Sequence, residues 1–282
     1  MDIQVKSNDF QRFLKRCHCN DLIKDLVIQA DDNGIHARFS TKEKTLYGEV
    51  YLPSVKPKES GTLKIPRVKQ LLSTVARINS DIVRIVTRDA EDGSHEYCIT
   101  DGVGVGKIKT RMLQTDDANV VESYDSLLDG KMFDTETLEY VSKVKYENGC
   151  KVDYAMLTEV LKDAKAFGYE VYRFYTKTTK KDGEEKTYLM CAITNEHTQE
   201  TFNRTIAENN FIGDPKKIPD CYVGGGFKEI VTALLGTVDR ETNEETNTPV
   251  NVSMYFDENA ILMTDNKTFY FNLNTLEVWY GY

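Results

Sequence analysis

Residues 2–17, DIQVKSNDFQRFLKRC, show the pattern that decides the fold. The first residues alternate as a short strand, and residues 7–9 can cap a helix that begins near Phe10. From Phe10 to Cys17, apolar residues follow the i, i+3, i+4, i+7 spacing of one helix face. Three basic residues lie on the other face: Arg12, Lys15 and Arg16. The stretch predicts a strand followed by an amphipathic helix with a basic polar face.

Further strands and a second helix follow this stretch. Strand patterns occur at 25–30, 35–40, 45–52 and 62–65. The first two flank a hairpin turn at Asp31–Gly34, and Pro66 opens a helix that runs to Ile78. The polar side of this helix carries Lys69 and Arg77, and residues 66–80 contain no acidic residue. More strands are expected at 81–88, 96–100 and 104–110.

The same pattern returns from Lys151. Residues 151–164, KVDYAMLTEVLKDA, combine a strand-like start with a helix, and Lys162 and Lys165 lie on its polar side. A fourth helix follows Gly224–Gly226 and carries Lys228 outward. Strands are expected at 170–176, 187–194, 201–207, 250–256, 260–263 and 268–273. The chain therefore contains two copies of one unit, and an internal repeat of this length determines the fold prediction.

The repeat predicts an α+β protein with two tandem domains, each with two helices packed on a mostly antiparallel sheet. The N-terminal domain is expected at 1–111 and the C-terminal domain at 148–282. Residues 112–147 mix acidic residues with isolated apolar ones and are expected to connect the domains.

The charge balance limits how the chain could bind nucleic acid. With 36 Lys+Arg and 45 Asp+Glu, the formal net charge is -9, so bulk positive charge cannot hold DNA. The four helix windows, 8–20, 66–80, 153–168 and 223–236, contain nine basic and five acidic residues. They therefore carry +4 and the rest of the chain −13. The two helices of the second half nevertheless sum to −1.

No catalytic residue, cofactor or metal site is expected. Asp101–Gly106 has spaced glycines but neither a following helix pattern nor the Lys-Ser/Thr of a phosphate loop. Cys17–Cys19 lacks the spacing and the second pair that zinc needs. The six cysteines are expected to be reduced. Without an apolar run of membrane length or a secretory start, we expect a soluble intracellular protein, in the nucleus or in the cytoplasm or nucleoid.

Several of these features together resemble DNA polymerase sliding clamps, in particular the two-domain type similar to proliferating cell nuclear antigen (PCNA) and to phage clamps. They are the duplicated unit, the opening strand and helix, the strand at 34–39 (GIHARF), the acidic connector, and Thr248–Ser253 before the closing aromatic strand. The resemblance covers nearly the whole chain and rests on pattern and layout.

The resemblance implies a homotrimeric ring with its helices around a central hole. Such a ring would encircle double-stranded DNA without reading its sequence and act as a processivity factor in DNA replication and repair. It would focus the positive potential of the helix faces inward, which explains how an acidic protein could hold DNA. The implied DNA-facing residues are Arg12, Lys15, Arg16, Lys69, Arg77, Lys162, Lys165 and Lys228, and His18 or Lys24 could extend the set.

The resemblance also implies a docking pocket beneath the connector for short peptides of DNA polymerase, clamp loader and repair proteins. The matching positions are Phe39, Leu46, Leu127, Leu128, Pro249, Tyr270, Phe271 and Leu273. Strand alternation sends only some of residues 270–273 outward, so the others would be core.

Three features depart from the clamp pattern: a longer connector, a long Lys-rich hairpin at 177–186, and an aromatic tail at 277–282. An alternative is an open processivity subunit similar to the herpesvirus type. It would be monomeric or dimeric and would bind DNA directly and salt-sensitively. A third alternative, an enzyme, would need a cluster of perturbed titratable groups, for which the sequence offers no candidate.

Overall fold

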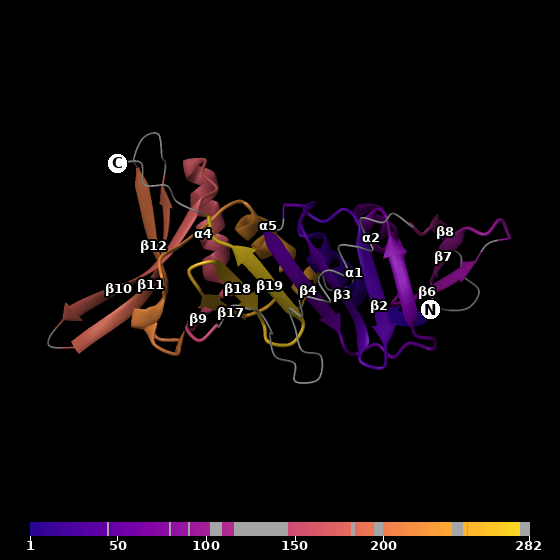
Figure 1. The fold of residues 1–282 in the computed structure, drawn as a ribbon, viewed down its shortest axis with the longest axis horizontal. Coiled ribbons are helices and arrows are strands. Elements are labelled where there is room, and N and C mark those ends of the chain that lie inside the picture. The colour runs from indigo at the N-terminus through magenta and orange to yellow at the C-terminus, as the bar shows by residue number, and fades with distance from the viewer. Residues whose placement is uncertain are drawn as a thin grey trace. The chain divides into compact units, whose positions relative to one another are not determined.

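The computed structural model describes residues 1–43, 45–78, 80–89, 91–101, 109–115, 146–181, 184–194, 200–238, 245–246 and 248–276. The chain divides into two compact units (Figure 1). Unit 1 comprises Met1–Val141, Ala233–Thr248 and Lys267–Phe269. Unit 2 comprises Ser142–Thr232, Pro249–Asn266 and Tyr270–Tyr282. Two short segments from late in the sequence therefore pack with the first unit.

The described part of unit 1 contains two helices and two main antiparallel sheets. Its elements are β1 (Asp2–Lys6), α1 (Ser7–His18), β2 (Leu26–Asp31), β3 (Gly34–Ser40), β4 (Leu46–Leu52), β5 (Gly61–Ile65), α2 (Val68–Ala76), β6 (Ile82–Asp89), β7 (His95–Thr100), β8 (Lys109–Leu113), β15 (Thr237–Val238) and β16 (Glu245–Thr246). The strands are ordered β1-β6-β7-β8 in one sheet and β4-β3-β2-β5 in the other. The expected order of strands and helices is confirmed for the described residues, and β15 and β16 are additional. Most of the strand predicted at 104–110 lies outside the described residues.

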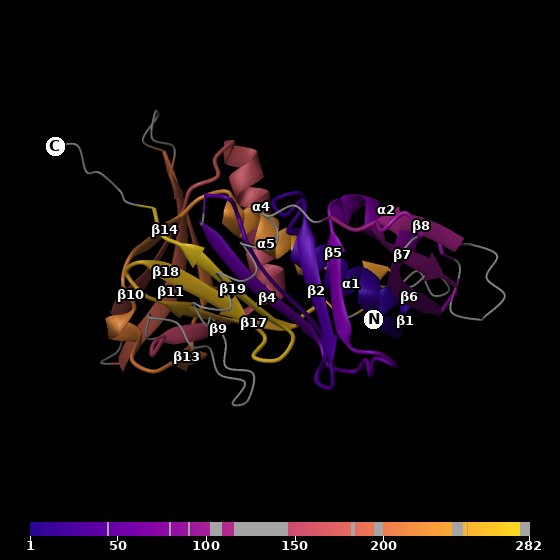
Figure 2. The ribbon, with the colours of Figure 1, turned by 45° about the vertical axis from the view of Figure 1, so that its right-hand side comes forward.

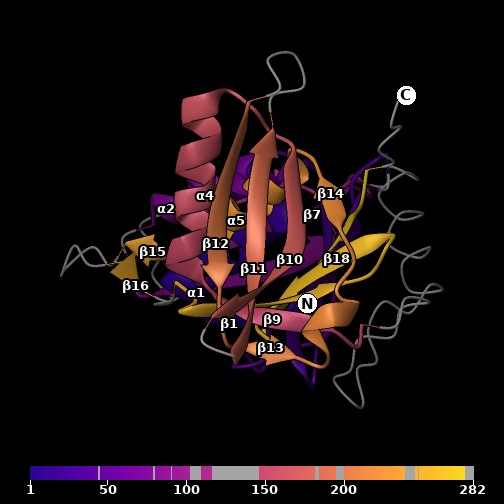
Figure 3. The same ribbon diagram turned by 90° about the vertical axis from the view of Figure 1, so that its left-hand side faces the viewer.

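Unit 2 repeats this architecture. Its elements are β9 (Gly149–Asp153), α4 (Tyr154–Phe167), β10 (Tyr172–Lys181), β11 (Glu184–Thr194), β12 (Thr201–Ala207), β13 (Phe211–Ile212), the short 3-10 helix η1 (Pro215–Lys217), β14 (Cys221–Val223), α5 (Gly226–Ala233), β17 (Asn251–Phe256), β18 (Ala260–Thr264) and β19 (Phe269–Asn274). One antiparallel sheet has the order β12-β11-β10-β14, and a second set runs β13-β9-β17-β18-β19. The helix α4 packs against β9, β11 and β12 (Figure 3).

The helices form where the apolar periodicity predicts them, with small shifts at their ends. The periodicity predicts an apolar stripe of five residues in α2, and four of them, Val68, Leu71, Val75 and Ile78, are buried. The fifth, Leu72, is half-buried. The helix begins at Val68 instead of Pro66, because the backbone angles of Arg67 (φ −145°, ψ 85°) are not helical. The Val68 N–H donates to the Lys24 carbonyl at 2.8 Å, so a preceding loop satisfies the first turn. No helix among the described residues is both long enough and apolar enough to cross a membrane.

The hairpin at 177–186 is more regular than the sequence suggests. Strands β10 and β11 pair without interruption from Tyr172 opposite Ile193 to Lys181 opposite Glu184. Cross-strand contacts support its outer part: the Thr178 and Thr187 hydroxyls lie 3.0 Å apart, and Lys180 pairs with Glu185 at 3.0 Å. The strands predicted at 170–176 and 187–194 therefore extend into the predicted hairpin.

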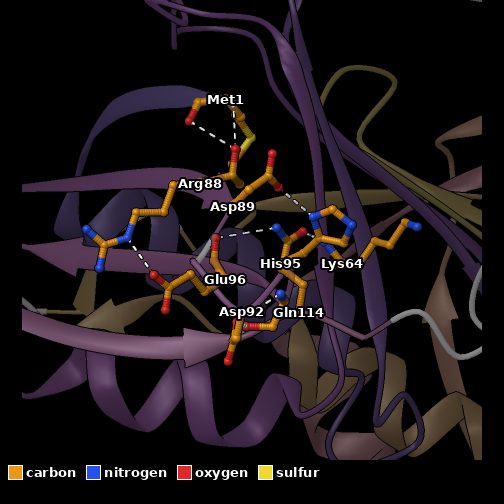
Figure 4. A network of polar contacts seen from close by, with 10 residues as sticks. Met1, Lys64, Arg88, Asp89, Asp92, His95, Glu96 and Gln114 are labelled. Carbon is orange, nitrogen blue, oxygen red and sulfur yellow. Dashed lines mark hydrogen bonds and ion pairs between the residues drawn. The ribbon is translucent and has the colours of Figure 1, made fainter.

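A polar network joins the two sheets of unit 1 (Figure 4). Gln114 follows β8, and its side-chain oxygen accepts a hydrogen bond from the Lys64 N–H of β5 at 3.0 Å. The Gln114 N–H donates to the His95 carbonyl of β7 at 2.8 Å. Next to it, Arg88 of β6 pairs with the buried carboxylate of Glu96 at 2.7 Å. The two bonds of Gln114 therefore connect the end of β8 to β7 in its own sheet and to β5 in the other sheet.

The hairpin between β2 and β3 depends on Gly34. Asp31 pairs with Gly34, which leaves the two-residue turn that the sequence predicts. Gly34 has a φ of +115°, and a Cβ there would lie 2.6 Å from the Leu52 carbonyl oxygen. Gly93 also has a positive φ, +81°, but a Cβ there would meet nothing within 4 Å. A comparison of the two glycines therefore distinguishes the cost of a positive φ from the cost of a steric clash.

We expect Gly34→Ala to lower the free energy of unfolding by about 3 kcal/mol, because it adds a clash to the cost of a positive φ. Gly93→Ala should cost only about 1 kcal/mol, since only the backbone cost remains. Urea unfolding followed by circular dichroism measures both values. Equal losses for the two variants would contradict the close contact at Leu52.

Candidate nucleic-acid interface

The polar side of α2 and the end of α1 form a groove in unit 1. Its volume is about 800 Å³, and four cationic side chains and one carboxylate line it. The cations are Lys24, Arg67, Lys69 and Arg77, and the carboxylate is Asp21. With the imidazole of His18 neutral, the lining carries +3. Such a concave, positively charged surface attracts polyanions.

Asp21 reaches this groove because of the way α1 ends. Cys19, Asn20 and Asp21 have consecutive φ values of 43°, 52° and 78°. Left-handed residues of this kind terminate a helix and turn the chain back. The Ile23 N–H then donates to the His18 carbonyl at 3.1 Å. The turn sets the Asp21 carboxylate opposite the polar side of α2.

Asp21 bridges a lysine and a histidine. Lys69 Nζ lies 2.7 Å from Asp21 Oδ2 and 3.0 Å from Oδ1. His18 Nε2 lies 3.1 Å from Asp21 Oδ1, and His18 Nδ1 accepts the Asp21 backbone N–H at 3.3 Å. Both bonds suit a neutral imidazole with its proton on Nε2.

The titration behaviour of the two residues follows from these contacts. The hydrogen bond from Lys69 lowers the pKa of Asp21, so this carboxyl is ionised at neutral pH. Burial lowers the pKa of His18, and this outweighs the attraction of Asp21. His18 therefore lines the groove without adding positive charge at neutral pH. Lys24 is exposed and does add charge.

The helix pattern predicts an exposed basic side for α1, but no residue of α1 is exposed. Arg12 pairs with Asp9 at 3.0 Å, and its side chain is 15% exposed. Lys15 Nζ donates to the carbonyls of Leu235 and Gly236 at 3.0 and 3.3 Å, just after α5.

The prediction that Arg16 faces DNA is wrong. Arg16 is 5% exposed, donates to the Thr268 hydroxyl at 2.7 Å and lies 4.9 Å from the centre of the Phe269 ring. The segments 233–248 and 267–269 belong to the same compact unit as α1. The residues of these segments that contact Lys15 and Arg16 lie more than 200 residues away from them in sequence, so helix periodicity could not predict the contacts. Arg16 is thus a core residue, and it does not reach a basic surface.

The predicted residues of unit 2 lie at its surface. Lys162 pairs with Glu159 at 2.6 Å, and Lys228 pairs with Glu170. Lys165 is exposed, and no ion pair joins it to a described residue. Of the eight predicted cations, the groove collects only Lys69 and Arg77. It also contains Arg67, which is not among the eight predicted DNA-facing residues.

The predicted docking positions are mostly core residues in the described part of the chain. Phe39, Leu46, Tyr270, Phe271 and Leu273 are each less than 5% exposed, and Pro249 is half-buried. Leu127 and Leu128 lie outside the described residues. These five predicted docking side chains are therefore buried and do not lie exposed at the surface.

The cysteines and acidic residues show no further site in the described ranges. All six cysteines are buried and none forms a disulfide, and burial raises the pKa of the Cys17 thiol. No group of three or more His, Cys, Asp or Glu side chains in the described ranges is placed to hold a metal ion.

Comparison with known proteins supports the fold. Neither a protein-family model nor a curated protein sequence matches the chain. Solved structures do match. The A. fulgidus PCNA with the C-terminal region of FEN-1 bound has a TM-score of 0.65 at 10% identity, over 98% of each chain. The PCNA of Entamoeba histolytica has a TM-score of 0.63 at 10% identity, again over 98% of each chain.

The PCNA of Thermococcus kodakaraensis has a TM-score of 0.61 at 13% identity, over 98% of this chain and 99% of that chain. These full-length matches show that the chain has the PCNA-like sliding-clamp fold. They confirm the expected α+β architecture with two tandem clamp domains. At identities this low, the likeness concerns the fold.

The Asp21–Lys69 contact can be tested by titration. We expect Lys69→Gln to raise the pKa of Asp21 from its lowered position, because the carboxylate loses the ammonium that stabilises it. The pair contributes stability above the ordinary pKa of Asp, and this contribution is lost as pH falls through the lowered pKa. Carboxyl carbon chemical shifts measured by NMR follow both effects.

Lys162→Gln is the matched control, since Lys162 pairs with Glu159 in unit 2. It should leave the Asp21 titration unchanged. An unaltered Asp21 pKa in Lys69→Gln would show that the pair does not form in solution.

Proposed function

We propose that this chain, which has the PCNA-like sliding-clamp fold, is a non-catalytic DNA sliding clamp. Three copies would form a homotrimeric ring around duplex DNA and tether a replicative polymerase as a processivity factor. The basic groove along α2 carries the proposal, because it places positive charge on a helix surface of a protein whose total charge is -9. Its domains would be 1–111 and 148–282, with a connector at 112–147.

Three of the exposed helix lysines support encirclement over direct tight binding. Lys69, Lys162 and Lys228 are each paired with a carboxylate of the same chain. An open monomeric or dimeric subunit would depend on free cations to hold DNA by counterion release. A ring needs less affinity per subunit, since topology retains it. The paired lysines therefore favour the ring.

The β-sheet edges support ring formation. In the described part of unit 2, β12 is the outer strand of its sheet and has seven residues. An open edge of this length can pair with a strand of another copy. Head-to-tail pairing of one edge with a different edge closes a ring when the rotation between copies fits.

Protein partners belong to the same proposal. The structural match to a PCNA with a FEN-1 segment bound supports docking of short segments of DNA polymerase, a clamp loader and DNA repair enzymes. Because the predicted pocket residues of the described strands are buried, we assign the docking contact to the connector residues Leu127 and Leu128. Such a clamp would act inside the cell, where DNA is replicated.

The groove assignment predicts that the double variant Lys69→Glu and Arg77→Glu weakens retention on DNA on the order of tenfold or more, because two phosphate contacts become repulsive. Polymerase stimulation at physiological salt and DNA retention both measure this effect. The control is Lys42→Glu with Lys56→Glu, two exposed lysines of unit 1 outside the groove. The oligomer should be unchanged in both variants. If the groove variant stimulates the polymerase as well as the wild-type protein does, the groove does not contact DNA.

The connector assignment predicts that Leu127→Ala with Leu128→Ala weakens partner binding, because a docked segment would lose its apolar anchors. Fluorescence anisotropy with C-terminal peptides of polymerase and nuclease from the same source measures the affinity. Ile82→Ala, on a side chain that is 43% exposed on β6, is the control. Equal affinities for all three proteins would rule out docking through the connector leucines.

A further inference from the structure

The Asp21 carboxylate occupies a position in the groove that suits an external anion. It contacts Lys69 with both oxygens, at 2.7 and 3.0 Å. Three more cations, Lys24, Arg67 and Arg77, line the same groove. A phosphodiester also presents two charged oxygens to a lysine, so the two groups compete for the same ammonium. Within the groove, Asp21 is the only carboxylate among the lining residues.

Both members of the pair are accessible. The side chain of Lys69 is 70% exposed and that of Asp21 is 57% exposed. Ion pairs at such exposure contribute little net stability and exchange readily with other partners. The Lys69 ammonium can therefore leave Asp21 for a phosphate without unfolding any element.

Asp21 has a second contact that holds it in place during such an exchange. His18 Nε2 lies 3.1 Å from its Oδ1, and the His18 side chain is only 9% exposed. The neutral imidazole donates to the carboxylate whether or not Lys69 is present. Asp21 then remains near the groove as a negative charge that opposes the incoming phosphate.

We propose that Asp21 is an internal substitute for a DNA phosphate, which occupies Lys69 in the free protein and limits the grip of the groove on duplex DNA. This inference rests on the proposed sliding-clamp function. Each phosphate that enters the groove must displace Asp21 from Lys69, so the contact is weak and reversible. Weak phosphate contacts allow a protein to move along the duplex.

Asp21→Asn tests this inference directly. Asn adopts left-handed backbone angles as readily as Asp, and its amide oxygen can still accept the His18 hydrogen bond. The variant therefore removes the charge and keeps the turn. Asp32→Asn is the matched control, because Asp32 is an exposed residue of the β2–β3 turn and its change alters the net charge equally.

The measurement is the affinity for a linear fluorescent duplex over a range of salt concentrations. Asp21→Asn should tighten binding about fivefold near physiological salt, and the slope of log K against log salt should steepen by about 0.9 for each groove in contact. Adding Lys69→Gln to Asp21→Asn should abolish this gain. Lys69→Gln alone should weaken binding relative to the wild type, since Asp21 then stays beside His18 as a negative charge that Lys69 no longer compensates.

Two results would overturn the inference: Asp21→Asn binds no more tightly than Asp32→Asn, or the gain persists when Lys69 is also replaced. Failure of the proposed function is distinguishable, because it appears as equal loss of the protein from circular and linear DNA. If the protein stays on circular DNA but Asp21→Asn leaves the affinity unaltered, only the proposed role of Asp21 is wrong. Thermal unfolding confirms that each variant is folded.

Discussion

The burial of α1 constrains how unit 1 can present charge. This helix packs against β1, β4 and α2 (Figure 2), and its basic residues contact main-chain and side-chain groups of segments from late in the sequence. A helix enclosed in this way stabilises the unit but offers little basic surface. The groove charge therefore comes from Lys69 in α2, from Arg67 and Arg77 at its two ends, and from Lys24 in the loop after α1. The turn after α1 then determines how much of that charge is free, because it brings Asp21 to Lys69.

The local elements were predictable from the sequence, and the surroundings of each element were not. The stripe of α2 and the turn at Asp31–Gly34 depend on neighbouring residues, so periodicity and turn chemistry identify them. Arg16 looks like a surface residue in its helix, yet Thr268 and Phe269 enclose it from the far end of the chain. Similarly, the carboxylate in the groove was not predictable, because Asp21 lies in a turn and contacts Lys69 only in the folded chain. Alternation along β19 also could not show that Tyr270, Phe271 and Leu273 are all buried.

The net charge of -9 has a different meaning once the contacts are known. Charge sorting between helices and the remainder of the chain suggested a basic inner surface, but several of those helix cations are neutralised within the chain. What remains is a groove with a modest excess of positive charge. A protein of this kind would hold DNA poorly by attraction alone. Topological retention and weak, exchanging phosphate contacts together provide a consistent account of a mobile clamp.

The most direct test of this account is retention on a closed DNA. The protein is loaded at high concentration onto a nicked circular duplex, the complex is isolated by gel filtration in high salt, and half of it is linearised with a restriction enzyme. The account predicts that the protein stays on the intact circle and leaves the linear form. Equal loss from both forms would contradict encirclement.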